Sequence, residues 1–241
     1  MDDGSSATAL LELRNVEKEY RGLRPLRIQH LEVRQGERLA LLGFDQTTAE
    51  LFVNLATGAV IPDAGEVLAF GQSTAAIVDA DAWLASLDRF GILTDRAALL
   101  DGLSVEQNLA LGHTLELDPI PGPVRRSVAA LADELVISAA ELAAPAGAVA
   151  PLTRALLRLG RALALRPQLL LAEHPNAFLP PADLHEFTSR FSAVASARRL
   201  TTVVLTADLA FARAVATRVT SLQPSTGELR PTSGWGRWFS R

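Results

Sequence analysis

Cysteine is absent from the 241 residues, and Lys18 is the only lysine. The lack of cysteine excludes disulfides and thiolate metal sites and is typical of a cytoplasmic protein. No apolar run approaches the roughly 20 residues of a membrane-spanning helix, and residues 1–9 lack the apolar stretch of a signal peptide. The net charge of −4 comes without a long basic run, so we expect no nucleic-acid partner.

Two kinds of hydrophobic pattern alternate along the chain. Residues 10–16 and 26–33 alternate apolar and polar side chains, which predicts half-buried antiparallel strands. Short apolar runs predict buried strands at residues 38–43, 66–70, 168–172 and 201–206. Helical patterns cover residues 47–57, 104–143 with a break at 119–123, 152–165, 180–195 and 209–216. This alternation predicts an α/β fold with a mostly parallel sheet covered on both faces, and a loop after residue 227.

Four segments in a fixed order carry a family resemblance. They read LRIQHLEVRQGERLALLG, LSVEQNLAL, GRALALRPQLLL and TTVVLTADLAFARAVATRV. Over residues 10–223 the chain resembles the ATP-binding subunit of ABC transporters. The resemblance implies an ABC-type P-loop NTPase fold, with a mixed central sheet, an antiparallel N-terminal β subdomain and a helical subdomain at about residues 91–160. Residues 1–9 would be a flexible N-terminus and residues 224–241 a tail. The stretch FGILTDRAALLDGLSVEQNLAL is most similar to the bacterial lipid- and lipoprotein-trafficking branch.

The phosphate-binding loop of that family departs from its pattern here. A P-loop, G-x-x-x-x-G-K-[ST], wraps phosphates with backbone N–H groups, neutralises them with lysine and holds Mg²⁺ with a hydroxyl. The same positions keep Gly43 but place Thr48 at the second glycine, Ala49 at the lysine and Glu50 at the hydroxyl. A carboxylate about 4 Å from a phosphate charge costs roughly 4 kcal/mol at an effective dielectric near 20. We expect this loop not to hold ATP.

The other positions that the resemblance implies for catalysis are altered as well. Glu173 stands where an aspartate positions Mg²⁺, and His174 where a glutamate activates water. Asp95 replaces the glutamine that senses Mg²⁺, and Ala207 replaces the histidine that contacts the γ-phosphate. The signature LSGGQ corresponds to residues 149–153, which include Pro151 and no glycine. For His174 we expect a structural role.

One position of the nucleotide site retains its residue type. Tyr20 lies where the family stacks an aromatic ring on adenine, although ordinary packing is the more common role of such a tyrosine. The arginines at 154, 158 and 161 form one basic helix face, which we expect to be solvated.

Two segments are candidates for partner contacts. In the family, the surface around the glutamine loop and the helical subdomain grips the membrane subunit, here about residues 91–140. Leu99, Leu100 and Leu103 would lie on it. Near the C-terminus Trp235, Trp238 and Phe239 are interleaved with arginine, a composition found at interfaces. The tail could equally fold back onto its own domain.

The leading hypothesis is a pseudo-ATPase: a structural or regulatory subunit of a membrane transport complex that binds no cofactor. One alternative is an atypical nucleotide-binding subunit that uses Tyr20 and Glu173 to bind Mg-ATP and supports hydrolysis with an active partner. The other is a soluble dimeric scaffold. We expect a cytoplasmic protein, or one peripheral on the inner face of the membrane, that pairs with itself or with another ABC ATPase.

Overall fold

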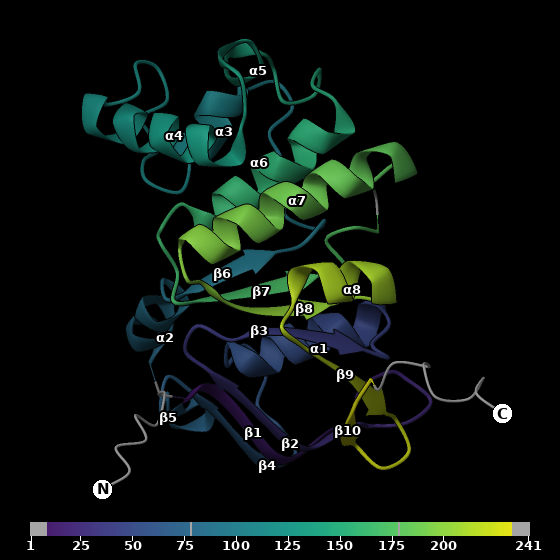
Figure 1. Ribbon diagram of the computed structural model, residues 1–241. Coiled ribbons are helices and arrows are strands. Elements are labelled where there is room, and N and C mark those ends of the chain that lie inside the picture. The colour runs from purple at the N-terminus through teal and green to yellow at the C-terminus, as the bar shows by residue number, and fades with distance from the viewer. Residues whose placement is uncertain (1–8, 78, 178, 233–241) are drawn as a thin grey trace, which may run out of the picture.

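The computed structural model describes residues 9–77, 79–177 and 179–232. Two sheets and three groups of helices form successive layers (Figure 1). The small sheet lies at one end, the larger sheet crosses the middle and the helices α3, α4 and α5 lie at the opposite end. Trp235, Trp238 and Phe239, the candidate interface aromatics, fall outside the described residues.

The four-stranded sheet is antiparallel, with strand order β2-β1-β4-β5. Its alternating pattern buries one face: Leu11, Leu13 and Val16 of β1 and Ile28 of β2 are almost fully inaccessible to solvent. The predicted pair of N-terminal strands is therefore confirmed. The strands are β1 Ala9–Lys18, β2 Leu26–Arg34, β4 Ala64–Ala69 and β5 Gln72–Ser73.

The six-stranded sheet has the order β10-β9-β3-β8-β7-β6. Every neighbouring pair is parallel except β10 with β9, so the sheet is mixed. The central strands are continuous apolar runs, as expected for strands buried on both faces. Its strands are β3 Arg38–Leu42, β6 Phe90–Leu93, β7 Leu169–Glu173, β8 Thr201–Leu205, β9 Arg218–Gln223 and β10 Glu228–Pro231.

Helices separate most of the parallel strands, and several begin at residues that cap them. Ser104 and Ser138 start α3 and α5 with reciprocal side-chain bonds to Gln107 and Glu141. The helices are α1 Gln46–Ala56, α2 Ala80–Leu87, α3 Val105–Ala110, α4 Gly122–Leu135, α5 Ala139–Ala143, α6 Pro151–Leu163, α7 Pro181–Ala197 and α8 Leu209–Val215, with a 3₁₀ turn η1 Thr74–Ala76.

Two hydrophobic clusters hold the layers together. The upper core cluster lies between the six-stranded sheet and the helices α3, α4, α6, α7 and α8, where Phe187, Phe191 and Phe211 pack against each other. The lower core cluster lies between the opposite face of that sheet, α1 and the four-stranded sheet, around Phe52. The central sheet is thus covered on both faces, as predicted.

The region after residue 227 was predicted as a loop, and that prediction is wrong. Residues Glu228–Pro231 form β10, which pairs with β9 through a turn at Gly227. The physical reason is the position of this segment, beside β9 and β2. Gly227 has φ +77°, which permits the tight turn, and the backbone oxygen of Gly227 accepts from Gln29 of β2. The strand is short and polar, so its sequence pattern is weak.

Candidate functional site

Most of the altered motif positions lie at one edge of the central sheet. Gly43 follows β3, Glu173 ends β7 and Ala207 follows β8. Because β3, β7 and β8 are parallel neighbours, their carboxyl ends meet there, beside the N-terminus of α1. In open α/β sheets ligands bind at this edge. The sequence mapping therefore brings together residues that are far apart in the chain.

In the loop before α1, a side chain of the loop itself takes up a backbone N–H donor. Asp45 is the N-cap of α1 and its Oδ1 accepts from the Thr48 backbone N at 2.8 Å and from Thr48 Oγ1 at 2.7 Å. These hydrogen bonds lower the pKa of Asp45, the backbone bond most strongly. Gly43 keeps its left-handed φ of +87°. The backbone turn survives, but a carboxylate of the protein already sits on a donor that a phosphate would need.

The position of the missing lysine is closed to solvent. Ala49 lies in the first turn of α1 with no exposed surface and packs in the lower core cluster. Its neighbour Glu50 points to the other side of the site and forms an ion pair with Arg96. The loop therefore offers an anion, and no cation, where phosphate charge would need neutralising.

Arg96 joins two of the altered positions. Its Nη2 donates to both carboxylate oxygens of Glu173, at 2.8 and 2.7 Å, while Nη1 contacts Glu50. The side chain of Glu173 has no exposed surface, and Thr94 Oγ1 also donates to it at 3.2 Å. Burial raises the pKa of Glu173, and Arg96 opposes that rise. Glu173, the candidate metal ligand of the sequence analysis, is thus bound by a protein cation.

His174 is buried and held in an uncommon backbone conformation. Its φ is +41°, and its backbone N donates to Leu205 O at 2.8 Å. Its Nε2 has no hydrogen-bond partner among the described residues, and the same holds for Arg158 Nε. Both residues, with Asp95 and Pro151, line a cavity of about 50 Å³. Neither a carboxylate nor an exposed base occupies the place of the water-activating glutamate.

The remaining positions show no phosphate-binding chemistry. Pro151 is the first residue of α6, whose N-terminus has no side-chain cap. Ala207 is exposed, and the adjacent Asp208 caps α8 by accepting from the backbone N of Ala210 and Phe211. Tyr20 packs partly against the lower core cluster, and the position of a Gly22 Cβ would lie 2.4 Å from its ring. Burial raises the pKa of Tyr20.

The arginine face of α6, which was expected to be solvated, is half-buried, and two of its arginines bind protein oxygens. Arg161 Nη1 donates to Ala98 O at 2.5 Å, and Arg154 Nη1 donates to Asp101 Oδ1 at 2.8 Å and to Ala146 O at 2.6 Å. The reason is the segment 94–101, which runs across α6 and presents carbonyl and carboxylate oxygens to it.

An apolar groove lies beside this segment, at the edge strand β6. It has a volume of about 260 Å³, and Ile92 and Leu165 on it are 37% and 50% exposed. Of the predicted partner contacts, Leu100 is 47% exposed, Leu103 is half-buried and Leu99 packs against the upper core cluster. The groove is lined by Phe90, Ile92, Ala97, Leu111, Gly112, Arg158, Arg161, Ala162 and Leu165.

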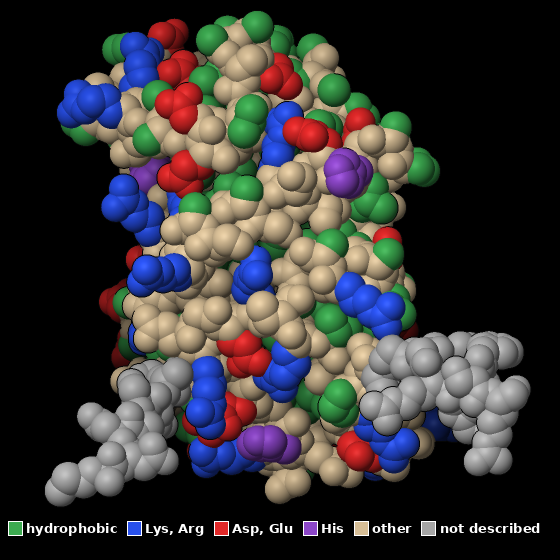
Figure 2. All heavy atoms as spheres, viewed as in Figure 1, with side chains coloured by type: hydrophobic (Ala, Val, Ile, Leu, Met, Phe, Trp, Pro, Cys, Tyr) green, Lys and Arg blue, Asp and Glu red, His purple; other side chains and the backbone are tan. Residues whose placement is uncertain are grey.

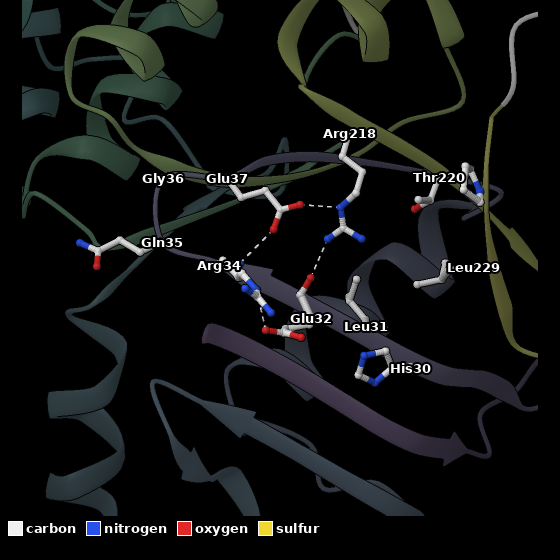
Figure 3. A pocket seen from close by; sticks show the side chains of 11 residues that line it. His30, Leu31, Glu32, Arg34, Gln35, Gly36, Glu37, Arg218, Thr220 and Leu229 are labelled. Atoms are coloured by element: carbon white, nitrogen blue, oxygen red, sulfur yellow. Dashed lines mark hydrogen bonds and ion pairs between the residues drawn. The ribbon is translucent and has the colours of Figure 1, made fainter. Parts of the chain in front are cut away.

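A larger cavity, of about 680 Å³, lies elsewhere, where β2 meets β9 and β10 (Figure 3). The charged side chains that line this cavity form hydrogen bonds and ion pairs with other groups of the protein. Arg218 Nε donates to Glu37 Oε1 at 2.5 Å and Nη2 to Glu32 O at 2.6 Å, while Arg34 pairs with Glu32. This cavity marks the joint between the two sheets.

The described residues contain no group of three or more His, Cys, Asp or Glu side chains that could hold a metal ion. None of their helices is long and apolar enough to cross a bilayer. On the face in Figure 2, Lys and Arg side chains are interspersed with Asp and Glu.

Sequence reasoning missed the two residues that fill the site, Asp45 and Arg96. Asp45 was visible as an aspartate three residues before Thr48, the spacing of a helix cap. Arg96 directly follows Asp95. Two acidic residues at the motif positions, Glu50 and Glu173, implied that a cation must compensate them. No local pattern indicated which arginine it would be.

No protein-family model matches the chain. Over 219 residues it is 30% identical to the sulfate/thiosulfate import ATP-binding protein CysA of Caulobacter vibrioides, covering 88% of this chain and 61% of that protein. Over 184 residues it is 30% identical to a probable ABC transporter ATP-binding protein of Azorhizobium caulinodans, covering 75% and 63%. The chain therefore spans less than two thirds of the length of these relatives.

Solved structures share the fold. The cbiO1 protein of Clostridium perfringens, described as part of the ABC transporter complex cbiONQ, superposes with a TM-score of 0.77 at 17% identity, covering 92% of this chain and 87% of that one. The dimeric cassette MJ0796, bound to ADP and Pi, gives 0.72 at 20% identity, covering 91% and 96%. The ABC-type P-loop NTPase fold is thereby confirmed. In sequence this chain is similar to ABC transporter ATP-binding proteins, and it shares the fold of ATP-binding cassettes.

Proposed function

We propose that this protein is a cassette subunit of a transport complex that neither binds nor hydrolyses Mg-ATP and acts through its surfaces. The observation that carries the proposal is the bridge from Glu50 through Arg96 to Glu173. A guanidinium occupies the place between these carboxylates. The residues present therefore do not fit Mg²⁺, and no catalytic step is assigned to it.

The phosphate side of the site supports the same proposal. Asp45 accepts the N–H of Thr48, and Ala49 supplies no charge. An ATP γ-phosphate would meet Asp45 and Glu50 instead of a lysine. Each unit charge at about 4 Å costs roughly 4 kcal/mol at an effective dielectric near 20. The favourable field of the α1 N-terminus, at most about 2 kcal/mol, does not offset that cost.

The docking surface supports a role in a complex. The groove beside β6 leaves Ile92 and Leu165 exposed between folded elements, and Leu100 is exposed nearby. Exposed apolar side chains that line a common hollow are typical of interaction sites. We propose that this groove, with the 91–140 surface, receives a membrane transport subunit.

The direct test is a calorimetric titration of the purified protein with Mg-ATP. We expect no binding tighter than about 1 mM, equivalent to about −4 kcal/mol. Binding at micromolar affinity would overturn the proposal. A parallel titration without magnesium separates nucleotide binding from metal-assisted binding.

Docking is tested by isolating the protein from membranes of its native cells. We expect Leu165→Asp to release the protein into the soluble fraction, because a charge then lies in the groove. Leu23→Asp is the matched control, since Leu23 is fully exposed on a loop remote in sequence from the groove. Equal membrane association of both variants would contradict the docking proposal.

The second candidate is an atypical subunit that still binds nucleotide and supports an active partner. The curated relatives favour it, because those cited above are named ATP-binding proteins. Under this candidate Tyr20→Ala weakens nucleotide binding measurably, whereas under the first proposal it changes nothing. The names of similar proteins specify several cargoes: sulfate for the Caulobacter vibrioides protein, and ribose and methionine for two others that are 28% identical to this chain. The lipid-trafficking branch remains a prediction.

A further inference from the structure

The segment 94–101 connects β6 to the turn before α3 and forms one wall of the apolar groove through Ala97. It contains no helix or strand. In such a segment the conformation depends on side-chain contacts, because regular backbone hydrogen bonds are few.

Arginine side chains hold this segment at three points. Arg96 lies within it and reaches Glu173 of β7 and Glu50 of α1. Arg161 of α6 binds Ala98 O, and Arg154 of α6 binds Asp101.

A buried amide holds the far end of the segment. Asn108 of α3 has no exposed surface, and its Oδ1 and Nδ2 bind the backbone N and O of Leu100 at 2.9 and 3.0 Å. The segment is thus attached to β7, α1, α6 and α3.

The contact of Arg96 with Glu173 differs from the other contacts because the Glu173 carboxylate is charged and inaccessible to solvent. The carboxylate of Glu173 is inaccessible, so leaving it unpaired is far costlier than breaking an exposed ion pair. The planar guanidinium also presents Nη2 to Glu173 and Nη1 to Glu50, so one side chain holds both carboxylates. Moving residues 94–98 away would strip Glu173 of its counter-charge.

We propose that Arg96 is a built-in cation that locks residues 94–101 in one conformation, so that the groove beside β6 is preformed without nucleotide or metal. This inference rests on the proposed function, because it names how the docking surface is regulated. The groove is then permanently available to its partner and does not follow an ATP cycle.

Hydrogen–deuterium exchange of the full chain, without nucleotide, tests the lock. We expect Arg96→Gln to speed exchange in peptides covering residues 94–103 by about tenfold or more, because local opening no longer breaks the bridge. Arg96→Lys keeps the charge but not the fork and should give a smaller increase. Exchange unchanged within about twofold in both variants would overturn the lock.

Matched variants guard against a general loss of structure. Arg230→Gln removes an exposed pair with Glu228 in the β9–β10 hairpin and should leave residues 94–103 unchanged. Where Arg96→Gln does not fold, Glu50→Gln weakens the bridge without leaving a buried charge, and a smaller increase confined to residues 94–103 is expected. A uniform increase over all peptides in every Arg96 and Glu50 variant would also overturn the proposal.

A separate arm distinguishes this inference from the proposed function. Adding Mg-ATP to the unsubstituted protein should leave exchange of residues 94–103 unchanged. If Mg-ATP binds and slows that exchange, the proposed function fails. If neither Mg-ATP nor the Arg96 substitutions change the exchange of residues 94–103, the proposal that Arg96 locks this segment fails and the proposed function stands.

Discussion

The guanidinium of Arg96 donates from one nitrogen to both carboxylate oxygens of Glu173, at 2.8 and 2.7 Å, and Glu173 has no exposed side-chain surface. Glu173 ends the strand that would carry the Mg²⁺-positioning carboxylate, and Arg96 follows the residue that would sense that ion. A protein side chain therefore makes the contact that a cofactor makes in the hydrolytic arrangement implied by the family.

Replacing Arg96 should make stability depend on pH. Burial already raises the pKa of Glu173 above its ordinary 4.5, and removing Arg96 removes what opposes that rise. An acid with a raised pKa in the folded state loses stability as pH increases above the unfolded value. We expect Arg96→Gln to cost about 3 kcal/mol at pH 8 and much less at pH 4.5, by urea unfolding. The double variant with Glu173→Gln should abolish this pH dependence; its persistence would contradict the assignment.

Asp45→Ala should destabilise the protein by about 1 kcal/mol through loss of the α1 cap. Asp45→Asn keeps a capping oxygen, so we expect its unfolding free energy to stay within about 0.5 kcal/mol of the parent. The hydrogen bonds from Thr48 lower the pKa of Asp45, so the parent's advantage over Asp45→Asn should fade as pH falls through that lowered value. Chemical denaturation at neutral and acidic pH measures both effects. An equal loss in the two variants would contradict the capping role, because asparagine retains the capping oxygen.

Comparing Gly65→Ala with Gly71→Ala separates the cost of the left-handed backbone conformation from the cost of a steric clash. Both glycines have φ near +80°, but a Cβ at Gly65 would lie 2.2 Å from Asn15 O, whereas a Cβ at Gly71 meets nothing within 4 Å. We expect about 1–2 kcal/mol of destabilisation at Gly71 from the left-handed conformation alone. The loss at Gly65 should be about 3 kcal/mol or more, because β1 and β4 must also separate. Thermal unfolding midpoints should rank the variants in that order.

Restoring the loop alone should not restore catalysis. In the double variant Ala49→Lys, Glu50→Thr the lysine and the hydroxyl return. Arg96 still occupies the metal position, and His174 still occupies the water-activating position. We expect phosphate release from ATP to equal that of the unsubstituted chain in a coupled assay. Release above that baseline would show that the loop alone was limiting.

Much of the fold followed from hydrophobic periodicity. The strand pair β1–β2 and the buried strands β3, β7 and β8 have patterns that burial imposes directly, so their existence was predictable within a few residues. β9 and β10 were not, because their residues are mixed in polarity and their pairing depends on contacts with β3 and β2. Long-range pairing leaves no local signal in such strands.

The candidate site likewise has one part that the sequence predicts and one part that it does not. Residues at fixed distances along known segments, such as Ala49, Glu50 and His174, could be placed from the sequence. The partners of those residues could not, since Arg96 reaches across 77 positions to Glu173. The arginines of α6 show the limit most clearly: spacing places them on one face, but only the fold shows that residues 94–101 cover that face.

A divalent ion held by carboxylates leaves when a chelator lowers its free concentration, and it returns when the supply recovers. The guanidinium of Arg96 is attached to the chain, so its local concentration beside Glu173 is fixed by covalent geometry. Under the proposed function, the edge of the sheet around Glu173 does not respond to the magnesium or ATP concentration of the cell. An occupant of the neighbouring groove would meet the same surface in a starved cell as in a growing one.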